Sequence, residues 1–323
     1  MVATHGIESG NWQESPTLAG TMEFGKLPDI EKIDFTLPPD PYQNKLVLQD
    51  LGAADSPIIY LGPTGYHMKP WVGKWYPPGT KEANFLKHYG EQFNTLEHNT
   101  THYRIPDISL VERWRENVPD DFRFCPKIPQ SISHARDLGM NGVEIKLFCD
   151  AIIELKEKLG YCFMQLPEGF GPRGLGILKR FLEYFPKSIP LALEVRNPLF
   201  FTIGEASADY FNLLEEQQIA AVITDVAGRR DVCHMRLTCP VTMIRFVGNG
   251  LHKSDYTRVE DWAKRLKSWF ESGLQSAYFF THEPDNLLAP ELAAICEEKF
   301  REAVPGLVTR GPNEAAGRQG TLF

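Results

Sequence analysis

Apolar and polar positions alternate along most of the chain in a pattern that predicts strands and helices in turn. Most of the stretches between apolar runs are amphipathic; Leu110, Trp114 and Val118, for example, recur at helical spacing. Strands that alternate with helices predict a parallel sheet, because parallel strands need crossover connections. The apolar, β-branched or aromatic runs predict strands at 57–62, 94–99, 122–127, 161–166, 191–196, 220–225, 242–247 and 276–281.

Eight strand–helix units over about 250 residues predict an α/β fold of the closed TIM (β/α)8 barrel type. The sixth unit is the weakest, since residues 226–241 leave room only for a short or irregular helix. A doubly wound open sheet is the alternative. Against it, no predicted strand is followed by the Gly-x-Gly-x-x-Gly turn that binds dinucleotides in such folds.

The two ends of the chain differ from the middle in composition. Residues 1–55 contain prolines, acidic residues and few periodic apolar positions, which predicts an extended N-terminal arm. Residues 56–305 contain the predicted barrel. Residues 306–323, which end "TRGPNEAAGRQGTLF", predict a flexible C-terminal tail.

Composition indicates a soluble globular protein. Of 323 residues, 42% are hydrophobic and 24% charged, and the net charge of −8 disfavours a broad non-specific grip on nucleic acid or an anionic membrane. No apolar run approaches the ~20 residues of a membrane span, and the N-terminus lacks the features of a signal peptide. The six cysteines are scattered without Cys-x-x-Cys pairs, so we expect buried, reduced thiols in a cytoplasmic protein.

Polar residues gather where the predicted strands end, which is where parallel barrels place their active sites. Several are ionisable, and buried charges cost several kcal/mol each unless they are paired. Such a concentration exceeds what stability requires, so we expect it to line a ligand site. The candidates are Thr64, Tyr66, Glu97, Asn99, Tyr103, Lys127, His134, Gln165, Glu194, Arg196, Asp225, Arg245 and His282.

We assign these candidates two roles. Glu97, Lys127, Glu194 and Asp225 are the candidate catalytic groups, and the remaining residues are candidates for substrate binding. Glu194 and Arg196 share one face of their strand, because alternate side chains point the same way. We therefore expect the charged members to converge in one cleft at the carboxyl ends of the strands.

The common cofactor motifs are missing from the sequence. It contains no His-Glu-x-x-His or Cys-x-x-Cys spacing, no Gly-x-x-x-x-Gly-Lys-Ser/Thr loop and no Gly-x-Ser-x-Gly elbow. No nucleotide cofactor or serine nucleophile is therefore indicated. The sequence does not exclude a divalent metal ion, but no motif indicates a site for one.

These segments resemble a known family, the YecE-like proteins of domain of unknown function 72. The resemblance covers about residues 57–300, and the family's Phe-Arg-Phe-x-x-Lys strand end falls on Lys127. Members often carry paired asparagines where this chain has His282 and Glu283. The resemblance implies a TIM barrel and supplies no reaction. The matching stretches are "LGPTGYHMKPWVGKWYPPGT", "YGEQFNTLEHNTTHYRIP", "VERWRENVPDDFRFCPKIPQSISHARDL", "FMQLPEGF", "ALEVRNPLFF" and "MIRFVGN".

Three functions fit the candidate residues. The first is an enzyme, a hydrolase being one candidate class, in which cations bind a phosphate ester or a nucleic-acid-related anion and carboxylates act as acid or base. The second is a non-catalytic protein that binds an anionic ligand or nucleic acid, with aromatic side chains near the strand ends stacking on bases. The third is a glycoside hydrolase-like carboxylate pair, which does not need several cations.

The last residues of the chain predict a protein partner. Gln319, Leu322 and Phe323 have the Gln-x-x-Leu-Phe spacing of the short peptides by which bacterial repair proteins dock on the sliding clamp. A flexible tail can insert two apolar side chains into a pocket while a glutamine fixes the register. The alternative is that the two apolar side chains fold back onto the protein.

Overall fold

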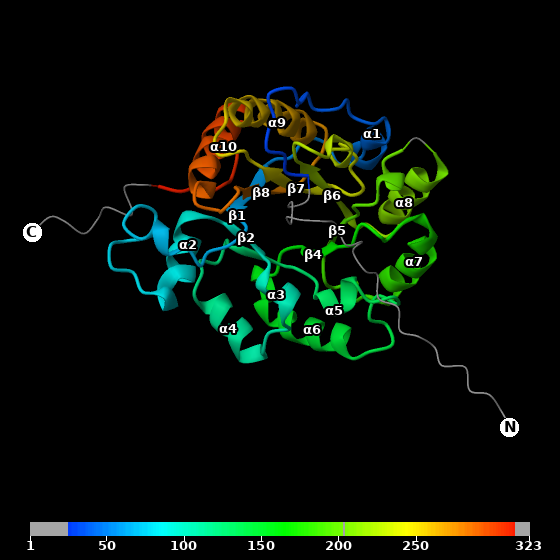
Figure 1. Ribbon diagram of the computed structural model, residues 1–323, viewed down its shortest axis with the longest axis horizontal. Coiled ribbons are helices and arrows are strands. Elements are labelled where there is room, and N and C mark those ends of the chain that lie inside the picture. The colour runs from blue at the N-terminus through cyan, green and yellow to red at the C-terminus, as the bar shows by residue number, and fades with distance from the viewer. Residues whose placement is uncertain (1–24, 203, 314–323) are drawn as a thin grey trace, which may run out of the picture.

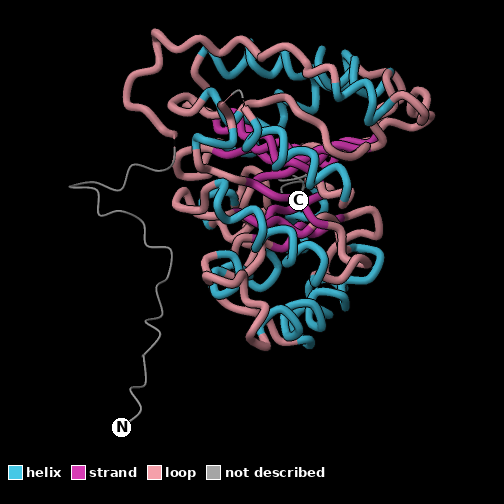
Figure 2. Tube along the Cα trace, turned by 90° about the vertical axis from the view of Figure 1, so that its right-hand side faces the viewer, coloured by secondary structure: helices cyan, strands magenta, loops and turns pink. Residues whose placement is uncertain are grey.

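The computed structural model describes residues 25–202 and 204–313. The predicted docking residues Gln319, Leu322 and Phe323 and the first part of the N-terminal arm lie outside these ranges. Strands lie in the middle of the described fold and helices surround them (Figures 1 and 2). The predicted alternation of strands and helices is confirmed.

All eight predicted strands are present within a few residues of the expected positions, and they pair in parallel. Their apolar, β-branched positions are buried on both faces, as expected for parallel strands covered by helices. The strands are β1 Ile58–Pro63, β2 Thr95–His98, β3 Arg123–Pro126, β4 Cys162–Gln165, β5 Leu191–Glu194, β6 Ala220–Asp225, β7 Val241–Val247 and β8 Ser276–His282.

The helices follow the amphipathic stretches, and the sixth unit contains only the short 3-10 turn Arg230–Val232, as predicted. The α-helices are α1 Gln43–Leu48, α2 Phe85–Gln92, α3 Thr100–Tyr103, α4 Ile108–Glu116, α5 Gln130–Ser133, α6 Glu144–Ile152, α7 Leu175–Tyr184, α8 Glu205–Glu216, α9 Lys253–Glu271 and α10 Ala289–Ala303.

The closed eight-stranded barrel predicted from the sequence is wrong. Six strands form one parallel sheet in the order β1-β8-β7-β6-β5-β4, a half-barrel, and β2 and β3 form a separate parallel pair. The doubly wound alternative is also wrong, because β4 to β8 follow one another in chain order without a reversal. The fold is α/β, with its strands in two hydrogen-bonded groups.

Specific contacts replace the missing strand ladders. Between β1 and β2, the Asn94 side chain accepts from the Leu61 N–H over 2.7 Å and donates to the Ile59 carbonyl over 3.2 Å. A Cβ at Gly62 would lie 2.1 Å from the Thr95 carbonyl oxygen, so the two segments meet at a distance that only glycine allows. Between β3 and β4, isolated bridges pair residues 124 with 159 and 127 with 163.

Apolar side chains fill the space between the half-barrel sheet and its helices. Helices α9 and α10 lie side by side along the part of the sheet that contains β7, β8 and β1 (Figure 1). Phe279 on β8 packs edge-on against Trp262 and Phe300 from these helices, with ring centres 6.1 and 4.9 Å apart. The six cysteines are buried and unpaired, as expected.

Both ends of the described chain pack against this fold. Asn44 on α1 donates to the Met235 carbonyl over 2.8 Å and accepts from the Leu237 N–H over 2.9 Å. At the other end, Val308 bonds to Pro57 and Ile59 at the edge of β1. Because the paired strands run parallel, their carboxyl ends lie on the same side of the fold, and polar side chains from several strands meet there.

Candidate functional site

Arg245, on β7, holds two glutamates from different strands. Its Nε and Nη2 donate to Glu97 over 2.9 and 3.0 Å, and its Nη1 donates to Glu194 over 3.0 Å. Glu97 ends β2 and Glu194 ends β5, so this one side chain links the half-barrel sheet to the separate β2–β3 pair. Each of the three residues is at most 8% exposed.

Two more side chains contact Glu97. The Asn99 amide donates to Glu97 Oε1 over 2.9 Å, and His282 Nε2 lies 3.2 Å from Glu97 Oε2. An ionised carboxylate only accepts hydrogen bonds, so His282 Nε2 must carry the proton. Burial lowers the pKa of His282 and outweighs the opposing effect of Glu97. His282 is therefore neutral near pH 7, and its Nδ1 is an acceptor.

Glu194 begins a second branch of the network. Gln165 Nε2 and Arg196 Nε donate to Glu194 over 3.0 and 3.1 Å. Lys127 Nζ in turn donates to Gln165 Oε1 over 3.1 Å. These residues come from β3, β4 and β5 and the loops that follow them, so adjacent strand ends supply one continuous chain of hydrogen bonds.

The cluster is ionised and carries a positive surplus. Burial raises the pKa of Glu97, but Arg245 and His282 oppose it and hold this pKa well below its usual value. The pKa of Glu194 is also lowered, because Arg245 and Arg196 outweigh burial. Two carboxylates thus face three basic side chains, those of Arg245, Arg196 and Lys127. Burial, followed by the charge of Arg245, lowers the pKa of Lys127 to about 8.

A cavity of about 260 Å³ opens beside this cluster. Thr224 on β6 lines it, and the Thr224 hydroxyl is buried without a hydrogen-bond partner in the described structure. Three basic side chains line it as well, namely those of Lys26, Arg196 and Arg245. The other lining residues are Thr64, Asn99, Val247, His282, Glu283, Pro284 and Asn286.

Asp225 does not join the cluster, although the sequence placed it there. Its carboxylate pairs with Arg258 and Arg230 and accepts from Trp262 Nε1 over 2.8 Å. Strand alternation is the cause. Thr224 is the register partner of Arg245, so Asp225 points to the opposite face, toward α9. The expectation that all six charged candidates meet in one cleft is therefore wrong for Asp225.

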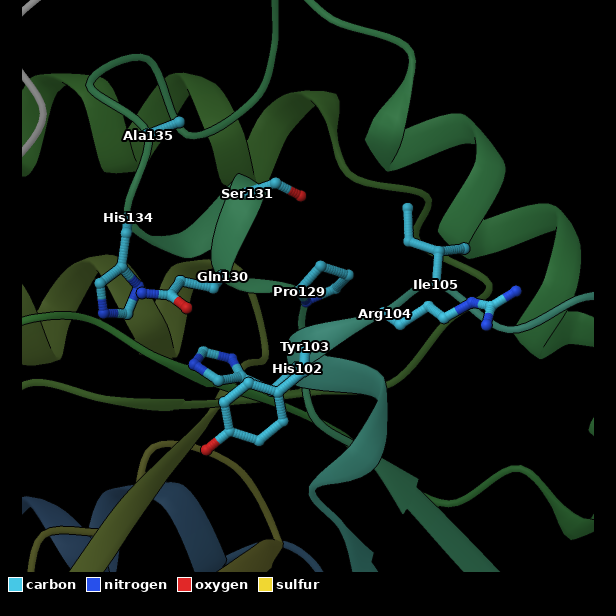
Figure 3. A pocket seen from close by; sticks show the side chains of 9 residues that line it. All are labelled: His102, Tyr103, Arg104, Ile105, Pro129, Gln130, Ser131, His134 and Ala135. Atoms are coloured by element: carbon cyan, nitrogen blue, oxygen red, sulfur yellow. The ribbon is translucent and has the colours of Figure 1, made fainter.

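Two of the predicted binding residues, Tyr103 and His134, line a different cavity of about 520 Å³ (Figure 3). It lies between the loops that follow β2 and β3. Tyr103 is 80% exposed, and the His102 and His134 rings meet edge-on with centres 5.6 Å apart. His102 Nδ1 lies 2.9 Å from the Ile128 carbonyl, so that nitrogen carries the proton and Nε2 can accept. Burial lowers the pKa of His102 to about 4.

Tyr66 lies apart from both cavities. Its ring packs against His98 and Tyr89, and its carbonyl accepts from the Tyr76 hydroxyl over 2.8 Å. Thr64, in contrast, lines the smaller cavity and donates to Asn286 over 3.3 Å. The loop after β1 therefore contributes Thr64 to the site and leaves Tyr66 in the packing behind it.

Sequence reasoning missed Lys26, Thr224 and His102. Strand alternation places either Thr224 or Asp225 toward the site but does not tell which of the two. His102 immediately precedes Tyr103, one of the predicted binding residues. Lys26 has no sequence signal, since it lies in a segment without periodicity.

Two further observations concern the described residues only. Among them, no group of three or more His, Cys, Asp or Glu side chains is arranged to hold a metal ion. Within the same ranges, no helix has the length and apolar character needed to cross a membrane.

Parallel strands whose carboxyl ends share a buried charged cluster beside a cavity define an α/β protein with a candidate ligand site at the strand ends. The chain belongs to the family described as "Protein of unknown function DUF72", whose model matches residues 60–316. The resemblance inferred from the sequence is confirmed.

Known proteins match most of the chain. The "UPF0759 protein YecE" of Escherichia coli strain K12, like that of E. coli O157:H7, is 33% identical over 284 residues, which is 82% of this chain and 100% of the relative. Two crystal structures of a DUF72 family protein from Enterococcus faecalis V583 superpose with TM-scores of 0.61 and 0.59 at 20% identity. They cover 75% of this chain and 95% and 96% of the solved chains, which supports the fold alone.

Proposed function

We propose that the protein is an enzyme that acts on a small anionic substrate, such as a phosphate ester or a nucleic-acid-derived phosphate, at the carboxyl ends of the strands. The observation that carries the proposal is a set of unused donors around the smaller cavity. Arg245 uses three of its five N–H groups on Glu97 and Glu194, and the other two have no acceptor in the described structure. The partnerless Thr224 hydroxyl lines the same cavity.

Unused donors in a buried site favour a ligand that accepts hydrogen bonds. A buried donor without a partner costs roughly 1–3 kcal/mol, and an oxyanion would remove that cost at Thr224 and accept hydrogen bonds from the two remaining N–H groups of Arg245. The excess of basic over acidic side chains in the cluster also favours binding of an anion. The cavity volume of about 260 Å³ suits a small metabolite, while the net charge of −8 disfavours a long nucleic acid.

The glycoside hydrolase alternative is less well supported. That reaction needs one carboxyl group to be protonated as the general acid. Glu97 and Glu194 both bond to Arg245, and the pKa of each is lowered. Two ionised carboxylates fit electrostatic stabilisation or proton acceptance better than proton donation.

The anion site is tested by thermal unfolding in phosphate, sulfate and chloride at matched ionic strength. Phosphate and sulfate should raise the Tm more than chloride, because a ligand of the folded state stabilises it by mass action. Thr224→Val should reduce this shift without lowering the Tm of the ligand-free protein, since the hydroxyl has no partner to lose. Thr242→Val is the matched control, because its hydroxyl is also buried without a partner but does not line the cavity. Equal shifts in all three salts would rule out the anion site.

Turnover separates an enzyme from a binding protein. The purified protein should release phosphate from a panel of small phosphate esters, and Glu97→Gln and Glu194→Gln should abolish the release. An anion-dependent Tm shift without turnover on any ester would support the non-catalytic binding protein instead.

A further inference from the structure

His282 differs from the other described histidines that pair with a glutamate, because its partner is buried. His282 Nε2 lies 3.2 Å from Glu97 Oε2, and Glu97 is 0% exposed. A buried carboxylate holds an imidazole ring firmly in one orientation, since water does not compete for the hydrogen bond. The other pairs lie at the surface, where the glutamate side chains are 48–60% exposed; they contain His67, His88 and His252.

Glu97 is itself fixed on both of its carboxylate oxygens. Oε1 accepts from Arg245 Nη2 over 3.0 Å and from Asn99 over 2.9 Å, and Oε2 accepts from Arg245 Nε over 2.9 Å. The ionised carboxylate can only accept, so it fixes the proton of His282 on Nε2 and the lone pair on Nδ1. Glu97 is therefore a positioning residue for the ring of His282.

The free acceptor of His282 opens on the cavity of the candidate site. His282 lines this cavity together with Arg245 and Thr224, and its side chain keeps 17% exposure. Nδ1 has no hydrogen-bond partner in the described structure and, unlike both ring nitrogens of His98, is not buried. A lone pair cannot bond directly to an oxyanion. A water molecule can donate to Nδ1, so the group that fits between the imidazole and a bound anion is water.

We propose that His282 Nδ1 is the general base that takes a proton from the attacking water in the hydrolysis of a phosphate ester. That the substrate is a phosphate ester rests on the function proposed above, with Arg245 and the Thr224 hydroxyl holding the phosphate. The proposal narrows the reaction to transfer of a phosphoryl group to water and makes His282 a catalytic residue. Carboxylate, imidazole and reacting group follow one another as in other sites where a base is oriented by a third group.

The reaction balances without an oxidant, a reductant or a second substrate. The water oxygen forms a bond to phosphorus, and one water proton moves to Nδ1. The bond between phosphorus and the leaving oxygen breaks, and the leaving alkoxide takes a proton from solvent. The imidazolium that forms is stabilised by the Glu97 carboxylate and then returns its proton to solvent.

Turnover of 4-nitrophenyl phosphate by the full-length protein and by His282→Gln tests the proposal. The variant should lose roughly 10²–10⁴-fold in kcat, which is the usual contribution of a general base. Its KM and its phosphate-dependent Tm shift should stay unchanged, because Nδ1 donates no hydrogen bond to the anion. Free imidazole should restore part of the activity of His282→Ala. His67→Gln is the matched control, since its ring also pairs with a glutamate but does not line the cavity, and it should turn over at the wild-type rate.

The pH profile separates a base from a structural histidine. The ratio of kcat/KM between wild type and His282→Gln cancels the ionisation of the substrate. This ratio should be constant near pH 7 and fall at lower pH, because the base must be unprotonated. The fall should begin below about pH 6.5, since burial lowers the pKa of His282 from its ordinary value. The charged groups that face the ring or line the cavity beside it are Glu97, Glu194, Arg245, Arg196, Lys26 and Glu283.

Diethyl pyrocarbonate provides a readout on the wild-type protein if the variants do not fold, because it acylates unprotonated imidazole nitrogens. Peptide mapping at pH 7 should find His282 modified, and inorganic phosphate should protect His282 but not the exposed His67. Loss of turnover should follow the modification of His282. Failure of His282 to react, or full turnover after it has reacted, would overturn the proposal.

The failure of this proposal differs from the failure of the proposed function. Wild-type turnover by His282→Gln, or a pH-independent ratio, would overturn the general base and leave the enzyme intact. If the wild type does not turn over 4-nitrophenyl phosphate, the base is overturned together with the enzyme. The salt-dependent Tm then still decides the anion site.

Discussion

Replacing Arg245 with methionine should destabilise the protein strongly, because it leaves two buried carboxylates without their shared partner. Glu97 and Glu194 are 0% and 2% exposed, and Arg245 supplies three hydrogen bonds to them. Breaking a buried ion pair by removing one partner costs roughly 3–5 kcal/mol. For a chain of this size that corresponds to a fall in Tm of roughly 5–10 °C.

The loss should also depend on pH, in a direction that follows from the pKa shifts. In the wild type the pKa values of Glu97 and Glu194 are lowered, so the two groups stabilise the fold above their unfolded pKa values, and this contribution is lost as the pH falls through the folded ones. Without Arg245, burial dominates and raises both pKa values above the unfolded ones. The variant is then penalised at high pH, and protonation relieves the penalty as the pH falls.

The assay is thermal unfolding of both proteins between pH 8 and pH 5. The Tm gap between wild type and Arg245→Met should be largest at pH 8 and should narrow toward pH 5. Adding Glu97→Gln to the variant should recover part of the loss. Arg265→Met is the control, since its pair with the half-exposed Asp40 should contribute at most about 1 kcal/mol. A Tm difference between wild type and Arg245→Met that is small, or constant over this pH range, would refute this prediction.

Three other predictions concern the strand contacts, the core and the tail. Asn94→Ala should cost roughly 1–3 kcal/mol and speed hydrogen exchange at the Leu61 amide, because it removes the side chain that accepts from this amide and donates to the Ile59 carbonyl. His98→Phe should leave the Tm unchanged or raise it, because both ring nitrogens are buried without partners and the ring packs 4.2 Å from that of Trp114; a fall of several degrees would contradict this. A peptide of the last residues, 314–323, should bind the sliding clamp of the same organism, and the Leu322→Ala/Phe323→Ala peptide should not; no binding of the wild-type peptide at high micromolar clamp would remove this partner.

The sequence located the strands because their signal is local. A run such as "AAVITD" is apolar and β-branched over its whole length, as buried parallel strands are, and it becomes β6 at residues 220–225. The closure of the sheet could not be predicted in the same way. Where a backbone ladder would join β1 to β2, the structure has side-chain contacts from Asn94 and the Tyr89 hydroxyl, together with the close approach at Gly62. None of these contacts leaves a periodic signal in the sequence.

The difference between local signals and contacts of distant residues also explains which site predictions were accurate. Glu97, Glu194 and Arg245 were found because charged residues at the ends of apolar strands are costly and therefore conspicuous. Asp225 has the same signal, and strand position alone could not decide which face it would take. That choice depends on Arg258 and Trp262, which lie more than thirty residues further along the chain, on α9.

The two buried arginines near β7 differ in how fully they are paired, and this difference separates a structural network from a candidate functional one. Arg258 lies within hydrogen-bonding distance of five oxygens, namely Asp225 Oδ1, Oδ2 and O, Asp255 Oδ1 and Val247 O. Four of these contacts are hydrogen bonds and the one with Asp225 Oδ1 is an ion-pair contact, so Arg258 is more fully paired than Arg245. Arg245 uses three of its five, beside a partnerless Thr224 hydroxyl and a Lys127 ammonium with a single acceptor. The proposed anion site therefore rests on the partnerless Thr224 hydroxyl and the unused N–H groups of Arg245, which lie on the adjacent strands β6 and β7.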